Sequence, residues 1–133
     1  MSTCYIPNTL DELGKVLGYL TKDSLILAGG TDLVLKMRSK HLSPDILLSL
    51  SDIPELREIR ITPEQAVIGS MATMHQVELA LNGLEDLQAL SDAAGGVGSP
   101  QIRNKASVGG NVANASPAAD TPSVLWALNA QVN

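Results

Sequence analysis

Two glycine-containing segments hold the residues best suited to binding an anionic ligand. In the first, a short apolar run leads into two glycines, and a helix is expected to start directly after them. Its residues are Leu27, Ala28, Gly29, Gly30, Thr31, Asp32 and Leu33. Glycine permits positive φ and lets a ligand approach without a Cβ in the way. Successive N–H groups at such a turn then converge on a negative group, and Thr31 adds a hydroxyl donor.

We expect the Asp32 carboxylate to accept hydrogen bonds from backbone N–H groups instead of facing the anion. The alternative is a tight strand-to-helix turn that binds nothing.

The second segment, residues 106–120, is rich in Gly, Ala, Ser and Asn and has almost no bulky side chains. We interpret it as backbone that lies against something large and flat. Gly109 and Gly110 are expected to offer unobstructed N–H groups, and Asn111 has both a donor and an acceptor. The ionised Asp120 only accepts hydrogen bonds and therefore suits a sugar hydroxyl. The candidate binding residues are Ser107, Gly109, Gly110, Asn111 and Asp120. The alternative is a loop of small residues packed under a helix.

Other polar and aromatic side chains receive structural interpretations. His75 lies near a helix start without an apparent His, Cys or carboxylate partner, which favours a solvated histidine over a catalytic one. Arg103 either touches a diphosphate or lies at the surface. Trp126 is interpreted as core of the last helix. Because the sequence has neither a nucleophile elbow nor a set of metal ligands, no catalytic residue and no metal site are assigned.

The first glycine segment is expected to lie in a βαβ unit. Thr9 and Glu12 form a T-x-x-E capping box that opens an apolar-faced helix. Residues 24–28 are predicted as a buried strand, 31–38 as a short helix and 45–50 as a second, parallel strand. Residues 51–54 are the best boundary between two lobes, which divides the chain into residues 1–54 and 55–133.

The second lobe is predicted to mix a hairpin with helices. Residues 59–61 and 66–68 flank a turn and predict the hairpin. Thr73 and Gln76 form another capping box and open a helix to about Leu81, and residues 84–94 predict a further helix. The glycine-rich residues 95–100 end that helix. A last helix is expected around residues 122–128, and residues 130–133 look like the beginning of a strand.

The composition indicates a globular protein and excludes several classes. Hydrophobic residues make up 44% and charged residues 17%, with no Phe, so the core must consist of Leu, Ile, Val, Ala and Met. The net charge of −5 argues against nucleic acid and anionic membranes as partners. The single cysteine, Cys4, excludes an internal disulfide and cannot by itself hold an iron–sulfur cluster. Since neither a signal peptide nor a membrane span is apparent, a cytoplasmic protein is expected.

The ordered segments resemble the FAD-binding domain of molybdenum hydroxylase flavoproteins, the group that includes the flavin subunits of xanthine dehydrogenase and carbon monoxide dehydrogenase. In that family a glycine-containing turn like residues 28–33 holds the FAD diphosphate. A segment like residues 107–111, continuing to 116–120, also lines the flavin nucleotide. The flanking residues agree: 5–7 and 10–12 resemble the family's opening, 68–73 its middle passage and 101–104 the approach to the second motif. The resemblance covers essentially the whole chain.

This resemblance implies an α+β fold of two α/β lobes, of the vanillyl-alcohol-oxidase type. A small βαβ lobe would precede a larger mixed α/β lobe, which is incomplete because family members continue well beyond this length and add a C-terminal domain. The cofactor would be FAD, bound by residues 27–33 and 107–111 and by Asp120. The partners would be an iron–sulfur subunit and a molybdopterin subunit. Electrons would pass from the molybdenum centre through iron–sulfur clusters to FAD, and from FAD to NAD or another acceptor.

Two alternatives to this function stay open. The chain could be a truncated remnant or a split-gene piece that folds but binds no flavin alone. It could also be a binding module for another nucleotide or phosphorylated ligand that uses the same glycine turns.

Overall fold

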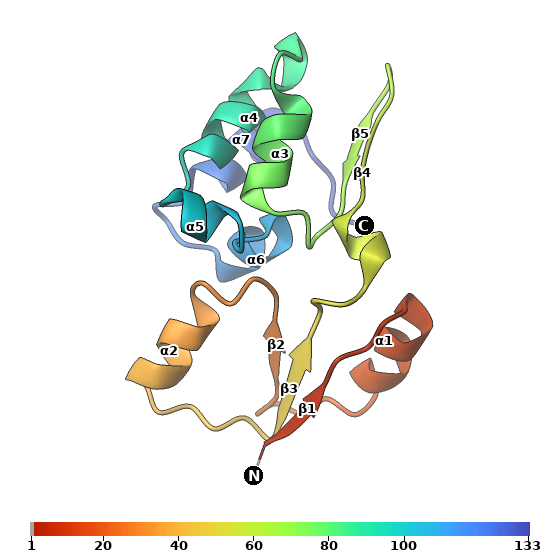
Figure 1. Cartoon of the computed structure of the whole chain (residues 1–133), viewed down its shortest axis with the longest axis vertical. Coiled ribbons are helices and arrows are strands. Elements are labelled where there is room, and N and C mark those ends of the chain that lie inside the picture. Colours follow the sequence, from red (N-terminus) through yellow and green to blue (C-terminus); the bar gives the residue numbers. More distant parts are fainter. Residues whose placement is uncertain (1) are drawn as a thin grey trace.

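The computed structural model describes residues 2–133, and its first part is built around a small parallel sheet (Figure 1). The elements of this part are β1 (Thr3–Tyr5), α1 (Leu10–Leu17), β2 (Leu25–Leu27), α2 (Leu33–Ser39) and β3 (Ile46–Ser49). The strand order is β1-β3-β2, and both pairs are parallel, with Cys4 opposite Leu47 and Ile26 opposite Leu48. The predicted βαβ unit is therefore confirmed. Figure 1 shows α1 and α2 on either side of this sheet.

Strand β1 was not predicted, because three residues are too few to show a periodic pattern. It becomes a strand by pairing with β3, which is the central strand of the sheet. The prediction that residues 24–28 form a buried strand is wrong for Ile26, which is 48% exposed. The Ile26 side chain lines an open cleft, which leaves it exposed.

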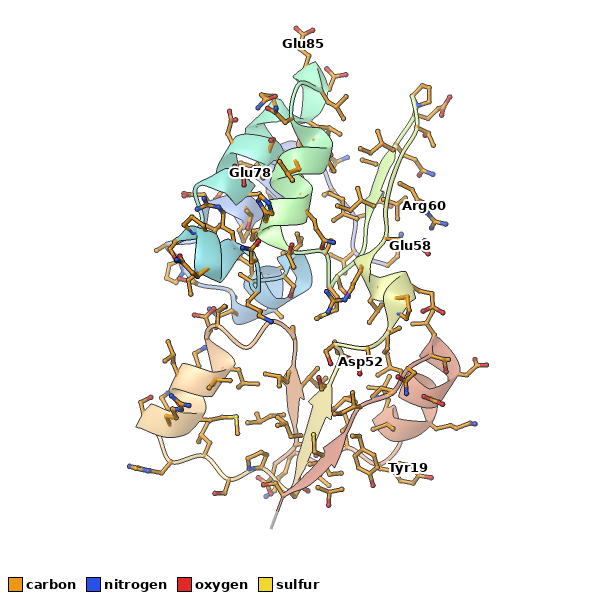
Figure 2. All side chains as sticks on the ribbon, in the orientation of Figure 1. Tyr19, Asp52, Glu58, Arg60, Glu78 and Glu85 are labelled. Atoms are coloured by element: carbon orange, nitrogen blue, oxygen red, sulfur yellow. The ribbon has the colours of Figure 1, made fainter. Side chains whose placement is uncertain are left out.

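The second part of the chain combines a hairpin with short helices. The hairpin strands are β4 (Ile59–Ile61) and β5 (Ala66–Ile68), paired antiparallel as predicted. The other elements are η1 (Pro54–Arg57), α3 (Met74–Leu81), η2 (Glu85–Leu87), α4 (Gln88–Gly95), α5 (Pro100–Arg103), α6 (Val108–Asn114) and α7 (Asp120–Ala127). Figure 2 shows Arg60 of β4 and Glu58, the residue before this strand, pointing away from the helices, with 3.9 Å between their charged groups. Among residues 2–133, no helix combines the length and the apolar character needed to cross a membrane.

The main core lies between α3 and α4. Met74, Val77 and Leu81 on one helix are fully buried, and they belong to one cluster with Leu90 and Ala94 on the other. The predicted capping box starts α3: the Gln76 N–H donates to Thr73 Oγ1 at 3.2 Å, and the Thr73 N–H donates to Gln76 Oε1 at 2.9 Å. The expectation of an aliphatic core without Phe is confirmed.

Two expectations for the C-terminal third are wrong, and one helix was not predicted. Residues 108–114, which were interpreted as backbone lying against something large and flat, form helix α6. The Ser107 hydroxyl caps this helix by accepting a hydrogen bond from the Gly110 N–H at 3.2 Å, which offsets the low helix propensity of two glycines. Trp126 is 88% exposed and is not core, because it projects from the outer face of α7. Residues 130–133 form no strand.

Candidate functional site

A cleft of about 810 Å³ lies beyond the carboxyl ends of β2 and β3, between the parallel sheet and helix α6. This volume falls within the usual range for small-molecule sites, and the end of parallel strands is where open α/β sheets bind ligands. Both glycine segments line the cleft. The predicted residues that line it are Ala28, Gly29, Gly30, Thr31, Asp32, Leu33, Ser107, Gly109, Gly110, Asn111 and Asp120. Leu27 does not line the cleft; its carbonyl accepts a hydrogen bond from the Leu50 N–H at 3.0 Å.

The β2–α2 turn, which lines this cleft, contains backbone donors that are not used within the protein. Within residues 2–133, the N–H groups of Gly29, Gly30, Thr31 and Asp32 find no hydrogen-bond acceptor. Gly30 has φ of +77°, a conformation that non-glycine residues rarely adopt. Consecutive free N–H groups in such a turn form a concave site for an anion. The expectation that the Asp32 carboxylate accepts hydrogen bonds from backbone N–H groups is wrong: Asp32 is the N-cap residue of α2, with φ −99° and ψ −46°, and its side chain makes no capping hydrogen bond.

The glycines of α6 have a different role from the one predicted. The Gly109 N–H donates to the Ser70 carbonyl at 2.8 Å and the Gly110 N–H to Ser107 Oγ, so neither is unobstructed. Instead, the missing side chains allow close packing. A Cβ on Gly109 would lie 2.7 Å from Ser70 Cβ, and one on Gly110 would lie 3.3 Å from Ala28 Cβ. The second segment therefore brings a helix against the first one and leaves the donors to the β2–α2 turn.

Gly29 brings the two glycine segments into direct contact. A Cβ on this residue would lie 1.8 Å from the carbonyl oxygen of Lys105 and 3.1 Å from Ala106 Cα. The chain around Ala106 is fixed in turn by α3, since the Met74 N–H donates to the Ala106 carbonyl at 2.9 Å. The turn that carries the free N–H groups thus rests on backbone held by the main core.

Two of the predicted polar residues occupy the far side of the cleft. Asn111 Oδ1 accepts a hydrogen bond from the hydroxyl of Thr121, a buried residue of α7, so its side chain ties α6 to α7. Its amide nitrogen stays available as a donor. Asp120, the first residue of α7, exposes its carboxylate to the cleft, where it can accept hydrogen bonds from hydroxyl groups.

Arg103 neither contacts the cleft nor lies free at the surface. Its guanidinium donates to the carbonyls of Val97 at 3.3 Å and Gly98 at 3.1 Å, and its Nε lies 3.6 Å from Glu78 Oε2. Glu78, which projects from α3 (Figure 2), also lies 3.4 Å from His75 Nδ1. The expectation that His75 lacks a carboxylate partner is therefore wrong. These three side chains fasten the glycine-rich turn of residues 95–98 to α3.

Several residues that line the cleft were not predicted. They are Ile26, Leu35, Lys36, Leu50, Ser70, Met71, Gly96, Val97, Gly98 and Ile102, among others. Gly98 has φ of +51°, and the glycine-rich run around it was the one available signal for a functional turn. The apolar members come from separate elements, and nothing in their sequence neighbourhood distinguishes them from core. The side chains of these apolar members add apolar surface to the lining of the cleft.

The comparisons with known proteins show which family this chain belongs to. The profile of one family, described as "FAD binding domain in molybdopterin dehydrogenase", matches residues 1–133. This chain belongs to that family. The FAD subunit of nicotinate dehydrogenase from Eubacterium barkeri is 36% identical over 129 residues, which cover 96% of this chain and 44% of the relative. The carbon monoxide dehydrogenase medium chain of Hydrogenophaga pseudoflava is 32% identical over 126 residues, covering 95% of this chain and 44% of the relative.

Solved structures of the family agree with the fold. Carbon monoxide dehydrogenase from Hydrogenophaga pseudoflava superposes with a TM-score of 0.80 at 31% identity, over 92% of this chain and 43% of the other. Quinoline 2-oxidoreductase from Pseudomonas putida 86 superposes with a TM-score of 0.84 at 25% identity, over 94% of this chain and 44% of the other. The chain thus spans less than half the length of these relatives.

The cleft fits the family's cofactor, FAD. Free N–H groups in a turn that begins with two glycines suit a diphosphate, and an exposed carboxylate suits the hydroxyls of a sugar chain. The apolar part of the lining suits flat ring systems. These three features occur in one continuous cleft, lined by both of the segments that carry the resemblance.

Proposed function

We propose that this chain is the FAD-holding part of the electron-transfer component of a molybdenum-containing hydroxylase or dehydrogenase. The observation that carries the proposal is the row of free N–H groups at residues 29–32, in a turn that lines the same cleft as the second glycine segment. The names of the relatives support it, because they include an FAD subunit and medium chains of dehydrogenases. When bound, FAD supplies the ability to accept electrons and pass them on.

Different residues of the chain bind different parts of FAD. The N–H groups of Gly29 to Asp32 hold the diphosphate, and Thr31 adds its hydroxyl. Asp120 accepts hydrogen bonds from the hydroxyl-rich portion, and the Asn111 amide donates beside it. Leu27 and Ser107 act indirectly, since Leu27 anchors the turn to the sheet and Ser107 caps α6.

The larger assembly is proposed from the same relationship. Electrons would reach FAD from iron–sulfur clusters of a partner subunit, which receive them from a molybdopterin subunit, and would leave to NAD or another acceptor. Residues 1–54 and 55–133 would act as two lobes that enclose the cofactor in a vanillyl-alcohol-oxidase-type arrangement. The exposed free thiol of Cys4 fits the reducing cytoplasm as the site of action.

A binding experiment tests the proposal directly. The purified chain is titrated with FAD, riboflavin and ADP-ribose, and binding is followed by flavin fluorescence or by thermal shift. The proposal predicts saturable, one-to-one binding of FAD in preference to both fragments. Preference for ADP-ribose would indicate a module for another nucleotide. A cooperatively folded chain that ignores FAD would contradict the proposal that these residues suffice.

A further inference from the structure

Lys36 is the one cationic side chain among the residues of the described chain that line the cleft. The other ionised groups there are the carboxylates of Asp32 and Asp120. Without Lys36, the lining would carry only negative charge and would repel anions. The free N–H groups of the β2–α2 turn can hold an anion, but they carry no net charge. A ligand with a diphosphate therefore depends on this lysine for charge neutralisation.

The position of Lys36 keeps its charge available. It lies four residues after Asp32 on α2, a spacing at which helical ion pairs commonly form. Among residues 2–133, however, no ion pair joins Lys36 to a carboxylate. Its Nζ instead donates to Oδ1 of Asn114 at the end of α6, which also lines the cleft. An ammonium group has three N–H donors, so two remain for a ligand while Asn114 holds the side chain in place.

We propose that Lys36, held across the cleft by Asn114, is the residue that selects ligands with a diphosphate over uncharged flavins. This inference rests on the proposed function, since it concerns the same cleft. The hydrogen bond to Asn114 restricts the lysine side chain before the ligand arrives, which lowers the entropy cost of ordering it. The lysine donates to the diphosphate from α2, which directly follows the turn with the free N–H groups, and so adds a positive charge to the anion site.

The test compares FAD, ADP and riboflavin on the purified chain and three variants. Lys36→Met removes the charge but keeps most of the side-chain length, and Lys36→Arg keeps the charge. Lys15→Met makes the same charge change on α1, which does not line the cleft. Thermal unfolding of each variant establishes that it is folded. Affinities are measured at low and at high salt, because an exposed charge is screened by ions.

Lys36→Met is expected to bind FAD and ADP about fivefold to tenfold more weakly than the unmodified chain at low salt, the size of one partly exposed charge-assisted hydrogen bond. High salt should narrow that difference, riboflavin should bind both proteins equally, and Lys36→Arg and Lys15→Met should bind FAD like the unmodified chain. Equal FAD affinity in the unmodified chain and Lys36→Met would overturn this inference alone. An equal loss of riboflavin and FAD would overturn it too, because Lys36 would then act through shape. If the unmodified chain binds neither FAD nor ADP, the proposed function itself fails, and the inference falls with it.

Discussion

Replacement of Gly29 by alanine should separate the two segments that build the cleft. The new Cβ would lie 1.8 Å from the Lys105 carbonyl oxygen, whereas real Cβ contacts essentially never fall below 3.0 Å. The backbone must therefore move by about 1.2 Å. Gly29 does not have positive φ, so alanine introduces this clash without added backbone strain.

The magnitude follows from what the clash involves. Overpacking usually costs about 1–3 kcal/mol. The upper part of that range is expected here, because the new Cβ is fixed to the backbone and the atom that it meets is a backbone carbonyl oxygen. Neither atom can move away by a side-chain rotation. A loss of about 3 kcal/mol is a large fraction of the stability of an ordinary domain. The turn could also move while the rest of the chain stays folded. The free-energy cost of the clash would then appear as weaker FAD binding, because the free N–H groups move with the turn.

The assay for Gly29→Ala is urea unfolding followed by far-ultraviolet circular dichroism, together with FAD titration. Fluorescence is a poor probe of unfolding because Trp126, the sole tryptophan, is 88% exposed in the folded chain. Gly14→Ala is the matched control: no atom lies within 4 Å of its new Cβ, and it is inside a helix. It should stabilise the chain by about 0.5–1 kcal/mol. Unchanged stability and unchanged FAD affinity in Gly29→Ala would refute the reasoning.

Two further substitutions test the elements that support the cleft. Thr73→Ala removes the capping hydrogen bond of α3 and should cost about 1 kcal/mol in urea unfolding, while Thr73→Ser should retain the stability; equal loss in both would contradict a capping role. Hydrogen bonds from the Thr21 and Ser24 hydroxyls and the Ile46 N–H lower the pKa of Asp45 below its usual 3.8. A lowered pKa means that this stabilisation is fully present above about 3.8 and is lost as the pH falls through the folded-state value. Asp45→Asn should therefore unfold at a lower temperature than the unmodified chain at pH 7, and the gap should close in acid; a gap independent of pH would contradict this.

Local signals in the sequence predicted the elements whose ends are fixed by their own side chains. The T-x-x-Q pattern at Thr73 predicted α3 because the capping hydrogen bonds connect residues only three positions apart. The two glycines after β2 predicted a turn, because glycine readily adopts the positive φ that Gly30 has in this turn. The short strand β1 and the small-residue helix α6 were missed because distant partners stabilise them. Strand β1 depends on β3, and α6 depends on its close contact with the β2–α2 turn.

The sequence predicted most residues of the candidate site, but it did not predict which of their N–H groups are free to bind a ligand. Both glycine segments line the cleft, yet the N–H groups of Gly109 and Gly110 pair within the protein, and those of Gly29 and Gly30 do not. The identities of the residues cannot distinguish these cases, because the acceptor for Gly109 is a carbonyl 39 positions earlier in the chain, at Ser70. The exposure of Trp126 was unpredictable for a similar reason: an amphipathic pattern does not say how completely a face is covered.

The most direct test of the central claim follows the backbone amides of the ¹⁵N-labelled chain by nuclear magnetic resonance during titration with FAD. The free N–H groups of Gly29, Gly30, Thr31 and Asp32 should show large downfield proton shifts as they acquire an acceptor. The N–H groups of Gly109 and Gly110, which already have acceptors, should shift less. FAD binding that leaves the amides of residues 29–32 unchanged would contradict the assignment of the diphosphate site to this turn.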